Sequence, residues 1–281
     1  MISPQFLFLH PDGSKPSEAL VALMRELGLP EVKTFAAAAD AIGQAAWSVK
    51  SANATQLERA LCQQKLGTLR PLFEELGVLR SWPAIKGLVR NDVTDAVWPA
   101  ASANLCVARL LGGIEAINCG IFPCLRRIIG LAAERRKPVT DELKQFQDLG
   151  LDVNTILVAG SVLEGNLLRE IWDKMQREFQ LLQGRLFGVV STNDVPPDAL
   201  KGIPTSLATF KAWRVRYPEV TSCAIFTAPP YGYRVWDEVQ HAIPDCEWIL
   251  VADVPENPSV VGAISEVGKI VYNLNNRLKG E

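Results

Sequence analysis

From Thr155 onward the chain alternates short apolar runs with amphipathic stretches, four times in succession. Each apolar run is rich in β-branched residues, and each is followed by a stretch with helical periodicity. Short apolar strands separated by helices are typical of a parallel sheet that helices cover on both faces. The four predicted strands are Thr155–Gly160, Leu186–Ser191, Cys223–Ala228 and Trp248–Asp253.

The first half of the chain carries weaker signals. Gln5–Leu9 is a short apolar run that ends in a His-Pro-Asp-Gly turn, and a helical pattern over Ser17–Leu27 follows it. Ala37–Leu111 is rich in Ala, Leu and Gln with long helical periods, so it indicates a helical region. Pro123–Arg135 also has a helical pattern. Further strand candidates are Val32–Ala36, Ile85–Val89 and Ile114–Cys119.

These patterns predict an α/β fold with a parallel sheet built from βα units. The predicted organisation is a first βαβ segment over 1–36, a helical insertion over 37–111 and a parallel βα half over 112–281. Residues 1–36 and 112–281 are expected to form one α/β domain. A mainly helical 37–111 favours an open doubly wound sheet with a helical insertion. A TIM-like barrel is the alternative, because seven or eight strand candidates within 281 residues also suit that fold.

Charge and hydropathy exclude several classes of partner. The formal net charge is −2, and Lys and Arg are spread along the chain, so no basic patch predicts nucleic-acid binding. No uncharged apolar run reaches the length of about 18 residues that a membrane span requires. The N-terminus lacks the basic and apolar segments of a signal peptide. We therefore expect a cytoplasmic protein with no membrane association.

The cysteines and histidines do not form a recognisable metal motif. Cys119 and Cys124 are the only close pair, and four intervening residues are too many for a CxxC pair. His10 and His241 are too few to complete a zinc site, so none is predicted. Reduced buried thiols are the favoured interpretation, with a redox pair or a cluster ligand set as the alternative.

Several sequence motifs of common α/β enzymes are missing. G-x-x-x-x-G-K-[ST], G-x-G-x-x-G and G-x-S-x-G do not occur, which disfavours a P-loop nucleotidase, a dinucleotide fold of the NAD type and an α/β-hydrolase serine. Gly160 and Gly165 flank a predicted strand-to-helix turn and could bring backbone N–H groups to an anion.

Ligands of parallel α/β sheets bind outside the carboxyl ends of the strands, because every βα loop and every following helix N-terminus lies there. The predicted loops at this edge carry acids, amides and hydroxyls. Asp12 and the catalytic candidates Glu164, Asp194 and Asp253 could act as general acids and bases or as ligands of a divalent cation such as Mg²⁺. The same residue types are also common helix caps and turn formers. The candidate substrate-binding residues are Ser161, Asn193, Tyr231, Tyr233 and Asn257.

Three fragments of this half resemble turns of the dihydrodipicolinate synthase and N-acetylneuraminate lyase family. They are AGSVLEG at 159–165, TAPPYGY at 227–233 and LVADVPENP at 250–258, and they occur in that family's order. Val162 and Leu163 depart from the first motif. No lysine-bearing strand follows residue 253, and Lys86 would serve only in a permuted strand order. The resemblance therefore assigns no Schiff-base chemistry, and we attribute it to similar βα loops that arose independently.

Two functional hypotheses follow. The chain either binds a small polar ligand, as a lyase- or transferase-type enzyme with carboxylates at the strand edge, or serves as a non-catalytic scaffold or adaptor in a protein assembly. Convergence of the carboxylates in a pocket would favour the first hypothesis. An exposed apolar patch that includes Trp82, Trp98 and Leu111 would favour a protein partner.

Overall fold

A computed structural model describes residues 4–51, 54–82, 88–133, 137–138, 142–196, 205–254 and 258–280. The chain divides into two compact units. The helical unit comprises residues 1–81, 229–237 and 254–281, and the sheet unit comprises 82–228 and 238–253. The chain thus returns twice to the helical unit after the sheet unit has begun.

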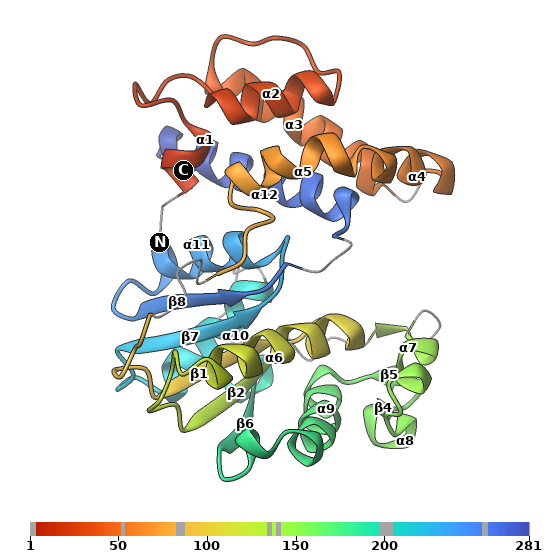
Figure 1. Cartoon of the computed structure of the whole chain (residues 1–281), viewed down its shortest axis with the longest axis vertical. Coiled ribbons are helices and arrows are strands. Elements are labelled where there is room, and N and C mark those ends of the chain that lie inside the picture. Colours follow the sequence, from red (N-terminus) through yellow and green to blue (C-terminus); the bar gives the residue numbers. More distant parts are fainter. Residues whose placement is uncertain are drawn as a thin grey trace. The chain divides into compact units, whose positions relative to one another are not determined.

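The sheet unit is built on five strands that are all parallel (Figure 1). Their order in the sheet is β6-β2-β1-β7-β8, so the first strand is central and the chain reverses its direction of travel between β1 and β7. The predicted parallel α/β sheet is confirmed. The strands are β1 (Asp95–Pro99), β2 (Arg127–Ala132), β6 (Leu186–Ser191), β7 (Ser222–Thr227) and β8 (Glu247–Ala252).

Helices cover both faces of this sheet. Alternate residues of each strand point to opposite faces, so the apolar side chains of one strand pack against helices on both sides. Phe226 of β7 packs into one apolar cluster with α6 (Ala103–Asn118) and α9 (Glu164–Glu178). On the other face Trp248 of β8 contacts two aromatic residues of α10 (Thr205–Arg216). Its ring centroid lies 5.6 Å from that of Phe210 and 5.1 Å from that of Trp213.

The remaining elements of the sheet unit are short. Three two-residue strands form a separate antiparallel sheet in the order β3-β5-β4. These elements are β3 (Lys137–Pro138), α7 (Leu143–Asp148), α8 (Val153–Ile156), β4 (Leu157–Val158), β5 (Ser161–Val162), η1 (Gln180–Leu182) and η2 (Thr192–Asp194).

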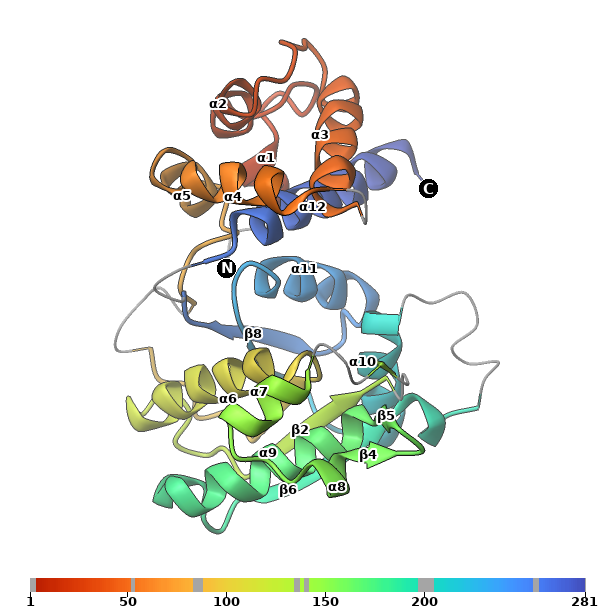
Figure 2. The same cartoon turned by 90° about the vertical axis from the view of Figure 1, so that its right-hand side faces the viewer.

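The helical unit joins the two ends of the sequence. Its C-terminal helix α12 runs along α3, as Figure 2 shows. Serine or threonine side chains cap α2, α3, α4 and α12, each accepting a hydrogen bond from a backbone N–H of the first turn. The helices are α1 (Pro4–Phe8), α2 (Glu18–Glu26), α3 (Phe35–Lys50), α4 (Gln56–Gln64), α5 (Leu66–Glu75) and α12 (Val260–Lys279), and the residues of α11 (Gly232–Ala242) are divided between the two units.

Several strand predictions are wrong. Gln5–Leu9 lies largely in helix α1. A five-residue apolar run is too short for its periodicity to distinguish a helix from a strand, so the strand prediction fails there. Val32–Ala36 forms no strand and leads into α3, which Thr34 caps. Ile114–Cys119 is the end of α6. Thr155–Gly160 splits into α8 and the two-residue β4, outside the parallel sheet. Residues 83–87, which cover most of the Ile85–Val89 candidate, lie outside the described residues.

Two central strands were not predicted as strands. Asp95–Pro99 forms β1, and Arg127–Ala132, which was expected to be helical, forms β2. Among the helices that the structure describes, none combines the length and apolar composition needed to cross a bilayer.

Candidate functional site

The reversal of strand order between β1 and β7 marks one place on the carboxyl edge of the sheet. In doubly wound sheets the loops on either side of such a reversal run in opposite directions, which leaves a crevice where ligands bind. The loop that leaves β1 is Pro99–Ser102, and it leads directly into α6.

Hydrogen bonds from α6 and β2 hold this loop in place. The guanidinium of Arg109, which is buried, donates through Nη1 to the carbonyl oxygens of Pro99 at 2.7 Å and Ala100 at 3.3 Å. The Ala100 N–H donates to the carbonyl of Leu131 at 2.8 Å. The loop is therefore fixed before any ligand arrives.

The N-terminus of α6 is capped in an unusual way. Ser102 has the extended backbone of an N-cap residue, but its side chain accepts no hydrogen bond from the first turn. The Ala101 N–H instead donates to the Sγ atom of Cys106 at 3.1 Å. The positive end of the α6 dipole is thus not neutralised by the Ser102 hydroxyl.

A buried hydroxyl lies at the end of the neighbouring strand. Thr227 is the last residue of β7 and is 1% exposed. Its Oγ1 atom has no hydrogen-bond partner in the described part of the chain. Leaving a buried hydroxyl unsatisfied costs about 1–3 kcal/mol, so a ligand or a water at this place would relieve a real penalty.

Glu164 and the loop after β6 meet on the carboxyl side of β2. Glu164 begins α9 and is 5% exposed, and its Oε2 atom accepts a hydrogen bond from the Ala133 N–H at 2.7 Å. Thr192 donates through Oγ1 to the carbonyl of the same Ala133 at 3.0 Å. These contacts fix the chain where it leaves β2.

Asp194 closes a capping box in the loop after β6. Its Oδ2 atom accepts from the Ser191 N–H at 2.8 Å, and the Ser191 hydroxyl accepts from the Asn193 N–H at 3.0 Å. Asp194 also lies 3.7 Å from the guanidinium of Arg216. Both predicted acids of this region therefore make hydrogen bonds that stabilise the local backbone.

The structure does not bring Asp253 to the other two carboxylates. Asp253 is exposed, follows β8 and lies beside Gly112 of α6. Three strand spacings separate β2 from β8, which amounts to about 14 Å. Asp253 and Glu164 are consequently too far apart to act on the same atom of a small substrate.

The predicted substrate-binding residues are dispersed. Ser161 is half-buried in β5 and pairs with β3 and β4. Asn193 is exposed, and Asn257 lies outside the described residues. Tyr231 is half-buried in the helical unit. Tyr233 belongs to the core of that unit, where its ring stacks on Trp236 at 6.0 Å between centroids, and burial raises the pKa of its hydroxyl.

Asp12, the remaining acid considered from the sequence, also belongs to the helical unit. It lies in an exposed turn and accepts a hydrogen bond from the Ser14 N–H at 2.9 Å. This hydrogen bond is the main reason that the pKa of Asp12 falls to about 2.

Charged residues at the amino edge of the sheet are paired with one another. Asp95, 1% exposed, binds the Nε atom of Arg127, and Arg90 bridges Asp92 and Glu247. Arg90 is not available to bind an anion, because carboxylate oxygens of Asp92 and Glu247 both lie within 2.7 Å of its Nη2 atom. We therefore place the candidate site at the carboxyl edge.

The described residues contain no group of three or more His, Cys, Asp or Glu side chains that are placed together so that they could hold a metal ion.

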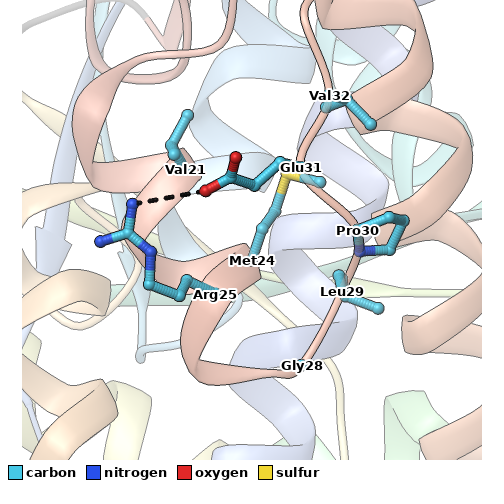
Figure 3. A pocket seen from close by; sticks show the side chains of 8 residues that line it. All are labelled: Val21, Met24, Arg25, Gly28, Leu29, Pro30, Glu31 and Val32. Atoms are coloured by element: carbon cyan, nitrogen blue, oxygen red, sulfur yellow. Dashed lines mark ion pairs between the residues drawn. The ribbon is translucent and has the colours of Figure 1, made fainter.

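The described residues of the helical unit line two hollows. The smaller, of about 190 Å³, lies between the end of α2 and residues 28–32, and its charged residues Arg25 and Glu31 form an exposed pair at 3.9 Å (Figure 3). The larger, of about 690 Å³, is lined mainly by apolar residues of α3, α4 and α5 and by Ile264 of α12. Neither gathers the convergent polar groups of a substrate site.

The cysteines give a prediction about thiol reactivity. Cys119 and Cys124 are exposed, whereas Cys106, Cys223 and Cys246 are buried. Burial raises the pKa of Cys246 to about 12 and that of Cys223 well above its ordinary value, so both stay protonated and unreactive at neutral pH. We expect a thiol reagent, followed by mass spectrometry, to label Cys119 and Cys124 first and the buried three only after denaturation. Early labelling of Cys223 or Cys246 would contradict the described core.

Comparisons with known proteins add no family to this picture: no family model, no curated protein and no solved structure matches the chain.

Sequence reasoning missed Ser102 and Arg109, because β1 was not predicted and no βα loop was therefore expected after it. A signal was present. An apolar run that ends in proline, followed by small residues and a serine before an apolar helix, is compatible with a strand, a loop and a helix N-cap.

Proposed function

We propose that this chain binds a small polar ligand with an anionic group at the carboxyl edge of its parallel sheet, in the crevice between β1 and β7. The observation that carries the proposal is the reversal of strand order between these two strands. The Arg109-held loop, the N-terminus of α6 and the buried Thr227 hydroxyl support it, because each is a polar feature on the two strands that flank the reversal.

The N-terminus of α6 is the reason that we expect the ligand to carry negative charge. Backbone N–H groups and the helix dipole at this end favour negative charge. Arg109 binds two loop carbonyls, so its role is to position the loop. The Asn104 N–H of the first turn already donates to the Oε1 atom of Gln145 at 3.3 Å, so the ligand's anionic group would be held by the other backbone N–H groups there, and the Thr227 hydroxyl would contact an uncharged polar part of it.

A thermal-shift screen tests the binding. Nucleotides, sugar phosphates, oxo-acids and divalent cations are each added to the full chain, because a ligand of the native state raises the melting temperature by mass action. We expect at least one anionic class to give a saturable increase. A flat response to every class would contradict the proposed function.

Ser102→Asp locates the site. Aspartate is as good an N-cap as serine, so the fold should keep its stability, but its carboxylate would occupy the place of the ligand's anionic group. We expect the ligand-induced shift to disappear. Ser259→Asp is the matched control, because Ser259 caps α12 in the helical unit and accepts from the Gly262 N–H at 3.0 Å. A shift that survives Ser102→Asp, or that is lost in both variants, would place the ligand elsewhere.

A lyase- or transferase-type reaction is the second candidate. Glu164 binds the backbone just after β2, and Asp194 binds the backbone at the end of β6. Both would serve as acid/base groups or as ligands of a divalent cation such as Mg²⁺ only if the substrate displaced these hydrogen bonds. Asp253 would act at a separate position. Once the screen has identified a ligand, Asp194→Ala distinguishes a catalytic from a capping role of Asp194. Loss of the chemical conversion of that ligand, with its binding unchanged, would support catalysis.

The adaptor alternative has less support at the surface first considered for it. Trp98 is 0% exposed, and its Nε1 atom donates to the Cys106 carbonyl at 3.0 Å. It therefore cannot form an exposed patch with Trp82 and Leu111. A protein partner would have to use other exposed apolar residues, of which Trp47 in α3 is 77% exposed.

A further inference from the structure

β6 is an edge strand of the parallel sheet (Figure 1). Its inner side pairs with β2, and the Leu186 N–H donates to the Arg126 carbonyl at 2.9 Å. The backbone groups of successive strand residues point to opposite sides, so the N–H and C=O groups of Phe187 and Val189 point away from β2. In the described part of the chain these outward groups have no hydrogen-bond partner. They are the groups to which another strand could bind.

The opposite edge of the sheet is covered. Trp82 pairs with Ala252 of β8 through two backbone hydrogen bonds of 2.6 and 2.8 Å, and every residue of β8 after Glu247 is buried. In β6, by contrast, Leu186 is 64% exposed and residues 187–189 are partly exposed. β6 also contains no proline and no charged residue, which are the usual means of preventing an edge strand from pairing.

The outward groups of β6 are complementary to themselves. At either end of the strand the outward N–H is already used: that of Arg185 donates to a carbonyl of the preceding turn at 3.2 Å, and that of Ser191 donates to a carboxylate of the following loop at 2.8 Å. The outward N–H groups of Phe187 and Val189 remain, one on each side of Gly188. If two copies align antiparallel about Gly188, Phe187 of each copy lies opposite Val189 of the other, and each such pair exchanges two hydrogen bonds.

Gly188 fits the centre of this alignment. It would lie opposite Gly188 of the second copy in a non-hydrogen-bonded pair, where two antiparallel strands approach most closely. Nothing described within one copy requires glycine there: its φ is not positive, and a Cβ atom would meet only a methyl group of Ile129 at an ordinary 3.6 Å. A glycine inside a strand often marks a place where another backbone comes close.

The charges at the two ends of β6 favour the same alignment. Arg185 precedes the strand and has no carboxylate partner in the described part of the chain. Asp194 follows the strand, and its only ion pair among the described residues is with Arg216 at 3.7 Å. The antiparallel alignment places Arg185 of each copy opposite Ser191 of the other, whose N–H binds Asp194. The basic end of one strand therefore meets the acidic end of the other.

We propose that two copies of this chain pair through β6, antiparallel and centred on Gly188, so that their five-stranded sheets join into one continuous sheet. The pairing satisfies the outward backbone groups and covers the exposed Leu186 with Val190 of the second copy. A single pair of strands is smaller than the roughly 1,200–2,000 Å² of a standard stable interface, so the dimer forms in a concentration-dependent equilibrium. The crevice between β1 and β7 takes no part in it, so neither proposal depends on the other.

Sedimentation equilibrium of the full chain tests the dimer. We expect the average mass to rise with concentration from 30.8 kDa towards twice that value. Val189→Pro removes an outward N–H that the pairing with β2 does not use, and Leu186→Lys places a charge on the exposed edge. Each should weaken dimerisation by about tenfold or more, while the circular dichroism spectrum stays that of the wild type.

Trp47→Lys is the control, because Trp47 is an equally exposed apolar residue, at 77%, but belongs to the helical unit. This variant should dimerise like the wild type. A wild-type chain that stays monomeric up to about 0.1 mM would overturn the proposal. A dimer that survives both β6 variants, or that only Trp47→Lys dissociates, would also overturn it.

A cysteine introduced at the centre of the pair tests the alignment. In a background with Cys119→Ser and Cys124→Ser, which removes the exposed thiols, Gly188→Cys should form a disulfide-linked dimer on mild oxidation. The two Cα atoms would be about 4.5 Å apart, within the roughly 4.4–6.8 Å that a disulfide spans. Leu186→Cys is more exposed, but its two copies would be separated by four residues along the strands, or about 14 Å, and should not cross-link. Cross-linking of Leu186→Cys as fast as Gly188→Cys, or of neither, would overturn the proposed alignment.

Discussion

Gly113→Ala is expected to destabilise the protein by about 1–3 kcal/mol, whereas Gly112→Ala should stabilise it by about 0.5–1 kcal/mol. The two glycines are neighbours in the middle of α6, so the helical preference of alanine is the same at both. A Cβ atom at Gly113 would lie 2.4 Å from the ring of Phe226 in β7. A Cβ atom at Gly112 would meet only Asp253, at an ordinary distance of 3.8 Å.

Chemical denaturation followed by circular dichroism measures both effects as shifts of the midpoint. The comparison is direct because propensity cancels between the two variants, which leaves the steric contact with Phe226. Equal stabilisation by both alanines would show that α6 does not approach β7 as described. The pair thus tests the packing that brings the N-terminus of α6 to the edge of the central strand.

The strands that the sequence predicts correctly are continuous apolar runs, of which β7 and β8 are buried along nearly their whole length and β6, at the sheet edge, only in part. The patterns at 186–191, 223–228 and 248–253 correspond to β6, β7 and β8 to within one residue at each end. Strands between two helical layers need apolar residues on both sides, so they form continuous apolar runs. Such runs are the clearest strand signal in a single sequence.

The same signal is ambiguous where a strand is short or contains a disruptive residue. β1 ends in Trp98-Pro99, and the proline indicates a break even though the end of a strand tolerates it. β2 contains Gly130, where a Cβ atom would lie 2.9 Å from a methyl group of Leu168 in α9. That glycine serves helix–sheet packing, which is a tertiary requirement. Thr155–Gly160 shows the converse, because an apolar run of the same kind forms α8 and the two-residue β4.

The candidate site was only partly predictable for the same reason. The rule that βα loops gather at one edge draws attention to Glu164 and Asp194, which bind backbone N–H groups just after β2 and at the end of β6, although Thr155–Gly160, the strand expected before Glu164, is not part of the parallel sheet. It does not reveal that Glu164 binds the Ala133 N–H, because that contact depends on the packing of α9 against β2. Ser102 and Arg109 could be considered only once β1 was known.

Asp95→Ala is expected to cost about 3 kcal/mol, because it leaves the guanidinium of Arg127 without its buried partner. Asp95 begins the central strand and is 1% exposed, and it binds the Nε atom of Arg127 and accepts from the Thr94 hydroxyl at 2.6 Å. Glu219→Ala removes a second partner of the same arginine, at 3.3 Å and 62% exposed, and should cost less than about 1 kcal/mol. Both variants keep the stacking of Arg127 on the ring of Tyr217, 4.7 Å from its centroid, so the difference measures burial of the carboxylate.

The midpoints of urea denaturation for the two variants and wild type give this difference. A loss for Glu219→Ala as large as that for Asp95→Ala would mean that Arg127 is held from the solvent side, and that the start of β1 is more open than the structure describes. The expected larger loss of stability for Asp95→Ala would instead show that the ion pairs at the amino edge serve to stabilise the fold. The ion pairs there satisfy one another, whereas at the carboxyl edge the buried Thr227 hydroxyl has no hydrogen-bond partner among the described residues, and it is there that we propose a ligand binds.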